Sequence, residues 1–156
     1  MFGTGTLMIL WGALWALTLA SCAFALWKGG PAERLGAGLI FTFAMLWELT
    51  FFLSPEARSM AQLVGDGLTA VGLLAIALRY ASLWLGAALM FQAAQFSLHS
   101  FYFVTHRPSD SLYIVVNNTN FFAILGCLTF GSLIAWRERS KAARAASLKP
   151  PAPATA

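Results

Sequence analysis

Charged side chains are scarce in this chain of 156 residues, where they make up 10% of the sequence against 59% for apolar side chains. Ordinary soluble domains carry about 25% charged residues. A chain of this length with so few charges is therefore not typical of a soluble domain. The composition indicates a polytopic membrane protein, and it makes the few ionisable residues inside apolar runs the first candidates for function.

Cysteine and histidine are also scarce, and their spacing excludes several cofactor classes. Cys22 and Cys127 lie inside apolar runs without CxxC or Cys/His ligand spacing. His99 and His106, the only histidines, would lie about 10.5 Å apart along one helix, so one haem cannot take both as axial ligands. No apolar run contains a lysine for a retinal Schiff base, and phosphate-binding motifs are absent. We therefore predict no cofactor, no resident metal and no catalytic residues.

Five apolar stretches are long enough to cross a bilayer as helices, which requires roughly 20 largely apolar residues. The predicted spans are residues 6–27, 35–53, 60–78, 82–105 and 111–136. The predicted fold is all-α, a bundle of five transmembrane helices that forms a single domain over residues 1–136. The third span is the weakest, because Gly65-Asp66-Gly67 lies within it. Those glycines favour either close helix packing or a helix that is broken around a site.

The positive charges predict an orientation. Five spans place the two termini on opposite faces of the membrane. If the C-terminus is cytoplasmic, the outer side holds only Arg58 and Arg107, which agrees with the positive-inside rule. We therefore expect a multi-pass protein of a bacterial inner membrane, with its N-terminus outside and its C-terminus in the cytoplasm. The cations on the cytoplasmic side would be Lys28, Arg34, Arg79, Arg137, Arg139, Lys141, Arg144 and Lys149.

The borders of the spans carry aromatic residues, which favour membrane interfaces. Residues 137–156 are basic and then Pro/Ala-rich, and we expect them to form a disordered cytoplasmic tail. That tail lacks the interleaved aromatics of a nucleic-acid binder, so the predicted partner is the lipid bilayer, and a homo-oligomer is left open. The aromatic residues expected at the cytoplasmic boundary are Trp27, Tyr80, Trp84 and Trp136, and those at the outer boundary are Tyr102 and Tyr113.

Polar side chains interrupt four of the predicted spans at a similar depth. A helix rises about 1.5 Å per residue, so Glu48, Asp66, His99 and Asn117 should lie about 8–9 Å below the outer face. Gln95 and Asn120 should lie about one turn deeper. Lipid cannot satisfy such groups, so we expect them to turn inward and meet. This polar layer consists of Glu48, Asp66, His99 and Asn117, with Gln95 and Asn120 below them.

Two interpretations of the polar layer remain open. Amides and histidine often hydrogen-bond between membrane helices only to fix their packing. Two carboxylates are harder to explain in that way, because the only cation at the depth of Glu48 and Asp66 would be a protonated His99. Buried acids of this kind suit proton exchange or cation binding. We therefore predict that the layer is an outer-leaflet site for a small ligand, a cation or a proton.

The second half of the chain resembles a group of phage proteins. Asp66 is followed by Arg79, then by FQAAQFSLHSFY (residues 91–102) and LYIVVNNTNFF (residues 112–122). This order is similar to that of small, uncharacterised multi-span membrane proteins of tailed phages and prophages. The resemblance implies a phage role, such as a holin that oligomerises into membrane lesions.

A third hypothesis, independent of that resemblance, is a membrane-embedded metal-dependent enzyme. Its ligands would be Glu48, Asp66 and His99. This donor set suits zinc only in part, because zinc usually takes several His or Cys ligands.

Overall fold

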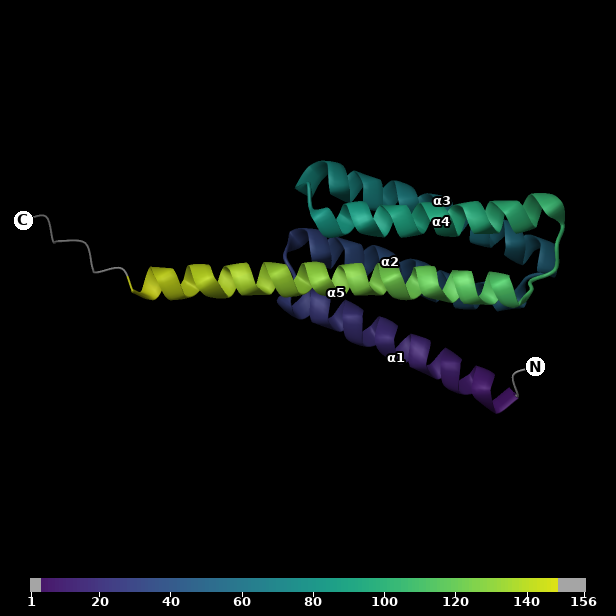
Figure 1. The fold of residues 1–156 in the computed structure, drawn as a ribbon, viewed down its shortest axis with the longest axis horizontal. Helices are drawn as coiled ribbons and strands as arrows, with labels where there is room; N and C mark the ends of the chain where they lie inside the picture. Colours follow the sequence, from purple (N-terminus) through teal and green to yellow (C-terminus); the bar gives the residue numbers. More distant parts are fainter. Residues whose placement is uncertain (1–3, 149–156) are drawn as a thin grey trace, which may run out of the picture.

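The computed structural model describes residues 4–148, and helices account for nearly all of them (Figure 1). No strand occurs within these residues, which confirms the all-α prediction. The helices are α1 (Thr4–Lys28), α2 (Pro31–Leu49), the short 3-10 helix η1 (Thr50–Phe52), α3 (Pro55–Tyr80), α4 (Leu83–Thr105) and α5 (Ser111–Ser147).

Within residues 4–148, three helical segments are long and apolar enough to cross a membrane: Pro31–Phe52, Pro55–Tyr80 and Ser111–Ser147. The predicted membrane character of the chain is therefore supported for three helices rather than clearly for five. In α4, the apolar run is interrupted by Gln92, Gln95 and His99, which lowers its hydropathy.

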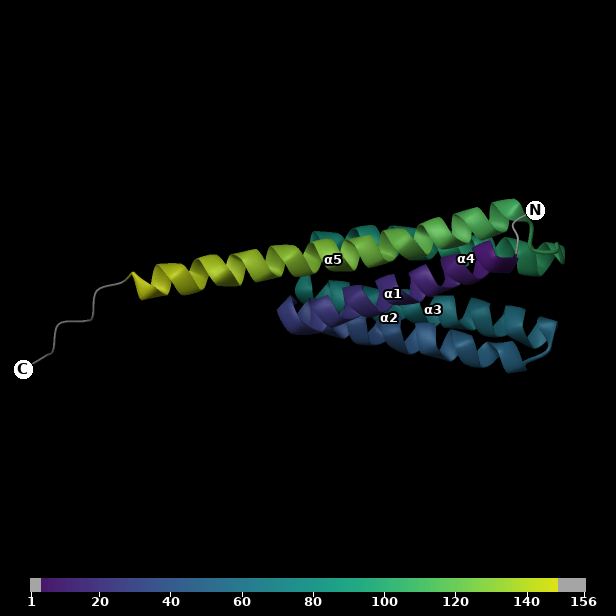
Figure 2. The same cartoon turned by 90° about the horizontal axis from the view of Figure 1, so that it is seen from below.

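The five long helices form a closed ring. Each helix packs on the next one in the chain, and α5 packs back on α1; α2 and α5 also touch. We call one end of the bundle the basic end, where α1 ends at Lys28 and α3 ends at Tyr80. The other end, where α3 begins at Pro55 and α5 begins at Ser111, is the cavity end. Figures 1 and 2 show α5 extending past the other helices at the basic end, and Figure 1 shows α1 diverging from α5 toward the N-terminus.

Short links with clear sequence signals produce this up-and-down arrangement. Proline is the first residue of both α2 and α3, a position where its missing N–H costs nothing. At the start of α3, Ser54 accepts a hydrogen bond from the backbone N–H of Ala57. At its end, Ala81 takes a left-handed conformation with φ of 46°, which lets the chain reverse directly into α4.

Two helices, α3 and α5, are much longer than predicted. α3 begins at Pro55 and runs unbroken through Gly65-Asp66-Gly67, so the alternative of a broken third helix is wrong. The glycine that brings helices together is Gly72, where an added Cβ would lie 2.7 Å from a methyl group of Leu39 on α2. α5 continues past Trp136 to Ser147, because its Ala, Arg, Lys and Glu residues are strong helix formers although they are not apolar. The basic part of the expected disordered tail is therefore helical to Ser147, and residues 149–156 lie outside the described part.

The basic end is organised around one indole ring. Trp84, at the start of α4, is 5% exposed and fits against Gly36 of α2 and Gly131 of α5. Its Nε1 donates a hydrogen bond of 2.8 Å to Oε1 of Glu33, which is itself buried. Trp84 was expected to be a membrane-interface residue, but it turns into the bundle, because the two glycines leave room for its ring.

Candidate functional site

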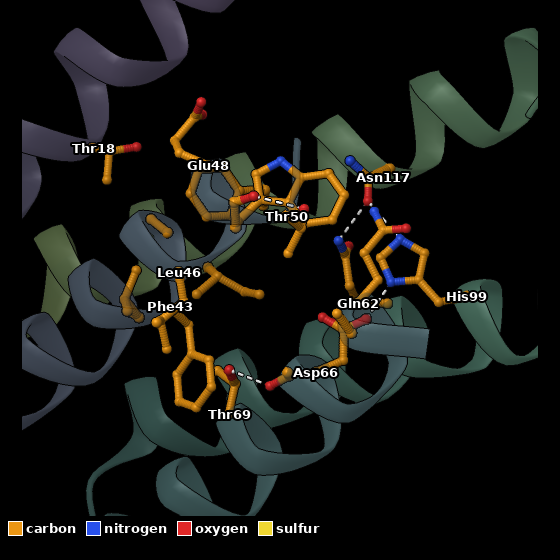
Figure 3. Close-up of a pocket in the computed structure, with 18 of the residues that line it drawn as sticks. Thr18, Phe43, Leu46, Glu48, Thr50, Gln62, Asp66, Thr69, His99 and Asn117 are labelled. Carbon is orange, nitrogen blue, oxygen red and sulfur yellow. Dashed lines mark hydrogen bonds and ion pairs between the residues drawn. The ribbon is translucent and has the colours of Figure 1, made fainter. Parts of the chain in front are cut away.

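A cavity of about 600 Å³ occupies the cavity end and is lined by residues of all five long helices. It reaches from Leu53, just after η1, to Ile40 and Ile124 near the middle of the bundle. Its lining is mostly apolar or aromatic, and a group of polar side chains gathers on the wall formed by α3, α4 and α5 (Figure 3). A volume of this size and a lining of this kind are typical of small-molecule sites.

An acid and a histidine form the centre of that polar wall. Oδ2 of Asp66, on α3, contacts Nδ1 of His99, on the neighbouring α4. The His99 side chain is buried at 6% exposed, and the Asp66 side chain is partly buried at 16% exposed. Gln92 supports the acid, since its Nε2 lies 3.2 Å from both Oδ1 and the backbone carbonyl of Asp66. The carboxylate therefore meets donors at both of its oxygens, as a buried charge requires.

The far side of the histidine ring faces α5. Oδ1 of Asn117 lies 2.9 Å from Nε2 of His99 and accepts a hydrogen bond of 2.6 Å from Nε2 of Gln95. Both ring nitrogens of His99 thus face oxygen atoms. A neutral imidazole has one N–H, whereas an imidazolium donates from both nitrogens. Each ring nitrogen of His99 therefore has an oxygen atom beside it that can accept an N–H, from Asp66 on one side and from Asn117 on the other.

Two buried polar atoms of the described residues have no hydrogen-bond partner: Oε1 of Gln95 and Nδ2 of Asn120. Gln95 is 8% exposed and lines the cavity. Buried polar atoms nearly always find a partner, so its Oε1 is an acceptor that a donor inside the cavity could satisfy. Asn120 is also buried but does not line the cavity, and none of the hydrogen bonds of Asp66 and His99 among the described residues goes to it.

Glu48 lies on a different wall of the cavity from the Asp66–His99 pair (Figure 3). Its Oε1 accepts hydrogen bonds from two indoles of α1, at 3.0 Å from Nε1 of Trp15 and 3.4 Å from Nε1 of Trp11. Of the predicted layer, the structure therefore brings together Asp66, His99, Asn117 and Gln95. It places Glu48 in the same cavity but apart from them, and it leaves Asn120 outside.

Several site residues were not predicted. Gln92 lies one turn from Gln95, and this spacing predicts that it shares a face with Gln95 and His99, but it was not included among the predicted site residues. Trp11 and Trp15 carried no such signal, because tryptophan near the end of an apolar span is also expected at the lipid interface. Tyr113 was expected at the outer boundary of the membrane. Its ring instead packs beside the His99 ring, with 5.4 Å between the two ring centroids.

Asp110 organises that loop. Its Oδ1 accepts hydrogen bonds of 2.6 Å from the Tyr102 hydroxyl and 2.9 Å from the backbone N–H of Tyr113. These two bonds, the hydroxyl first, lower the pKa of Asp110 below its usual value, and the charge of Arg107 acts in the same direction. The carboxylate thereby fixes the start of α5 above the polar wall.

This loop makes stability depend on pH. A carboxyl whose pKa is lowered on folding stabilises the protein above the pKa of the unfolded state, about 3.9, and that contribution is lost as the pH falls through the folded pKa. We expect Asp110→Asn to be less stable than the wild type at pH 7, and the difference to shrink well below about pH 4. Thermal unfolding of both proteins across this range measures it, and a difference that stays constant would contradict the assignment.

Comparison of the chain with protein-family models, curated proteins and solved structures finds no match. Within the residues that the structure describes, no three His, Cys, Asp or Glu side chains come together as metal ligands. The interpretation of the site therefore rests on its own geometry.

Proposed function

We propose that this chain is an integral inner-membrane protein of five spans whose outer-half cavity binds a small ligand, cation or proton. The observation that carries the proposal is the largely buried Asp66–His99 pair on the wall of a cavity of about 600 Å³. In this proposal the N-terminus lies outside, the C-terminus lies in the cytoplasm, and the cavity end faces outward.

Two features support five spans. α1 and α4 are integral to the ring, and they expose large apolar side chains, such as Leu26 on α1 and Met90 on α4, that lipid would cover. The helix ends also separate the charges, because Arg58 and Arg107 lie at the cavity end. Lys28, Arg34 and Arg79 lie at the basic end, beyond which α5 carries further cations. This distribution supports the proposed orientation.

A ligand site explains the polar wall better than packing alone. Polar groups that only hold helices together are expected to satisfy one another completely. Here the polar wall borders a cavity, Oε1 of Gln95 has no partner among the described residues, and Glu48 is directed away from the Asp66–His99 pair. These features leave both charge and hydrogen-bonding capacity available to a bound molecule.

The two other hypotheses draw less support from the site. A metal-dependent enzyme would need Glu48, Asp66 and His99 to converge, but Glu48 bonds to the indoles of α1 instead. A holin-like protein would direct polar groups toward neighbouring copies to line a lesion, whereas these polar groups face the cavity of their own bundle.

Cysteine labelling tests the proposed cavity and its orientation together. In a background with Cys22→Ala and Cys127→Ala, a cysteine replaces Asn118, which lines the cavity. The matched control is Val115→Cys, one turn earlier on α5 and 60% exposed, where it would face lipid. We expect a membrane-impermeant thiol reagent added outside intact spheroplasts to modify Asn118→Cys at least about tenfold faster, because the reactive thiolate forms in water and not in lipid.

Two results of the cysteine labelling would contradict the proposal. Equal rates at the two positions would mean that no water-filled cavity reaches residue 118. Labelling of Asn118→Cys only from the cytoplasmic side would mean that the orientation is inverted.

A further inference from the structure

We infer that the ligand of this cavity is an organic cation with an apolar body, and that Glu48 is its counter-ion. This inference rests on the proposed function, because it names the chemical class that the same cavity would accept. It follows from the charges of the cavity lining, the surroundings of Glu48 and the composition of the remaining walls.

The charges of the lining do not balance without a ligand. Among the described residues, the ionisable side chains of the lining are Glu48, Asp66 and His99, and the lining contains no lysine or arginine. Asp66 already contacts His99, the one lining residue of the described part that can carry a positive charge. Glu48 makes no salt bridge within the described residues, so an ionised Glu48 leaves the cavity with one uncompensated negative charge. A carboxylate in a half-buried apolar setting favours a cation beside it.

The surroundings of Glu48 suit an organic cation rather than a bare metal ion. Both indole N–H groups reach Oε1, and no hydrogen bond reaches Oε2 within the described part of the chain. Trp11, Trp15 and Trp47 line this side of the cavity, and indole faces attract ammonium or phosphonium groups. A metal ion would instead require several oxygen, nitrogen or sulfur ligands at close range, and only one carboxylate lies here.

The rest of the cavity suits an apolar body. Ile40, Phe43, Phe121 and Ile124 continue the lining toward the middle of the bundle. The free Oε1 of Gln95 adds one acceptor there, which matches a donor such as a second amine N–H but no anionic group. The lining therefore offers a ligand apolar and aromatic surface, neutral amides and hydroxyls, and one carboxylate, that of Glu48, without a salt-bridge partner among the described residues.

Two ions of nearly equal shape and opposite charge test the inference. Tetraphenylphosphonium and tetraphenylborate are added separately to the full-length protein in nanodiscs, and binding is measured by equilibrium dialysis against empty nanodiscs. We expect the phosphonium to bind saturably and the borate not to bind above the empty-nanodisc level. Glu48→Gln should weaken phosphonium binding at least about tenfold, as the loss of a close charge partner does. Glu56→Gln, which removes an exposed acid outside the lining, should leave it unchanged.

The outcomes separate this inference from the proposed function. Equal binding of the two ions, or phosphonium binding that Glu48→Gln leaves unchanged, would overturn the cation assignment while leaving the cavity as a ligand site. No saturable binding of either ion would also overturn it. If Asn118→Cys is then still labelled from outside, the proposed site survives for another ligand; if it is not labelled, the proposed function fails as well. Thermal unfolding of Glu48→Gln confirms that any loss of binding is not a loss of fold.

Discussion

Asp66→Leu should lower the free energy of unfolding by about 3–5 kcal/mol, because it leaves His99 buried without its carboxylate partner. His99→Leu should cost a similar amount, since it leaves the Asp66 carboxylate with Gln92 as its remaining side-chain partner. Combining the two substitutions should recover most of the loss, because a pair of apolar side chains often replaces a buried ion pair at little cost. The double variant should therefore be more stable than either single variant.

Reversible unfolding in mixed micelles measures this cycle. Val71→Leu is a suitable control, because residue 71 is 65% exposed on the same helix, and exposed substitutions usually change stability by less than about 0.5 kcal/mol. Additive losses in the double variant would mean that Asp66 and His99 act independently. That result would remove the ion pair from the centre of the site.

Gly131→Ala should destabilise the basic end by about 2–4 kcal/mol, from overpacking together with a lost buried hydrogen bond. A Cβ at residue 131 would overlap the indole of Trp84, and Gly36 on the opposite side leaves that ring no room to move away. Displacing the ring would also break its hydrogen bond to Glu33, which would leave a buried carboxylate oxygen without its indole donor. Free energies of unfolding measured in mixed micelles give the size of the effect.

Gly126→Ala is the matched control, because it makes the same substitution on the same helix. Nothing lies within 4 Å of a Cβ at residue 126, so the change should be neutral or stabilising by up to about 1 kcal/mol, as helix propensity predicts. Equal effects at the two positions would mean that the Trp84 ring does not occupy the space between Gly36 and Gly131.

The helices were largely predictable because bilayer length and apolar composition constrain them strongly. The beginnings of α4 and α5 fall within one residue of the predicted limits. The missed parts have physical causes. The apolar run that predicted the fifth span ends at Trp136. The residues after it have high helix propensity, so α5 continues to Ser147. α3 begins at Pro55 because proline starts a helix readily even when the next residues are polar.

Residue counting predicted some of the residues that meet at the site, but not all of their partners. Counting residues placed Asp66, His99 and Asn117 in one layer, and these three do meet. Depth alone does not reveal which way a helix face turns. For that reason Glu48 was expected beside Asp66, whereas the divergent α1 supplies it with two indoles on another wall.

Glu33 shows the same limit at the other end of the bundle. Its position beside a predicted loop suggested no role. In the structure its buried carboxylate accepts hydrogen bonds from Nε1 of Trp84 and from the backbone N–H of Gly30. The contact between Glu33 and Trp84 joins residues far apart in the sequence. It depends on how the helices pack together, which a local sequence pattern does not predict.

The most direct test of the Asp66–His99 pair is the ¹⁵N magnetic resonance spectrum of the His99 ring in lipid bilayers. His106→Gln leaves His99 as the only histidine in the chain, so its two ring nitrogens can be observed without overlap. We predict the signals of a ring that is hydrogen-bonded at both nitrogens, and a shift of both signals when Asp66→Asn is added. Signals of a water-exposed imidazole that Asp66→Asn leaves unchanged would contradict the buried pair, and with it the proposed site.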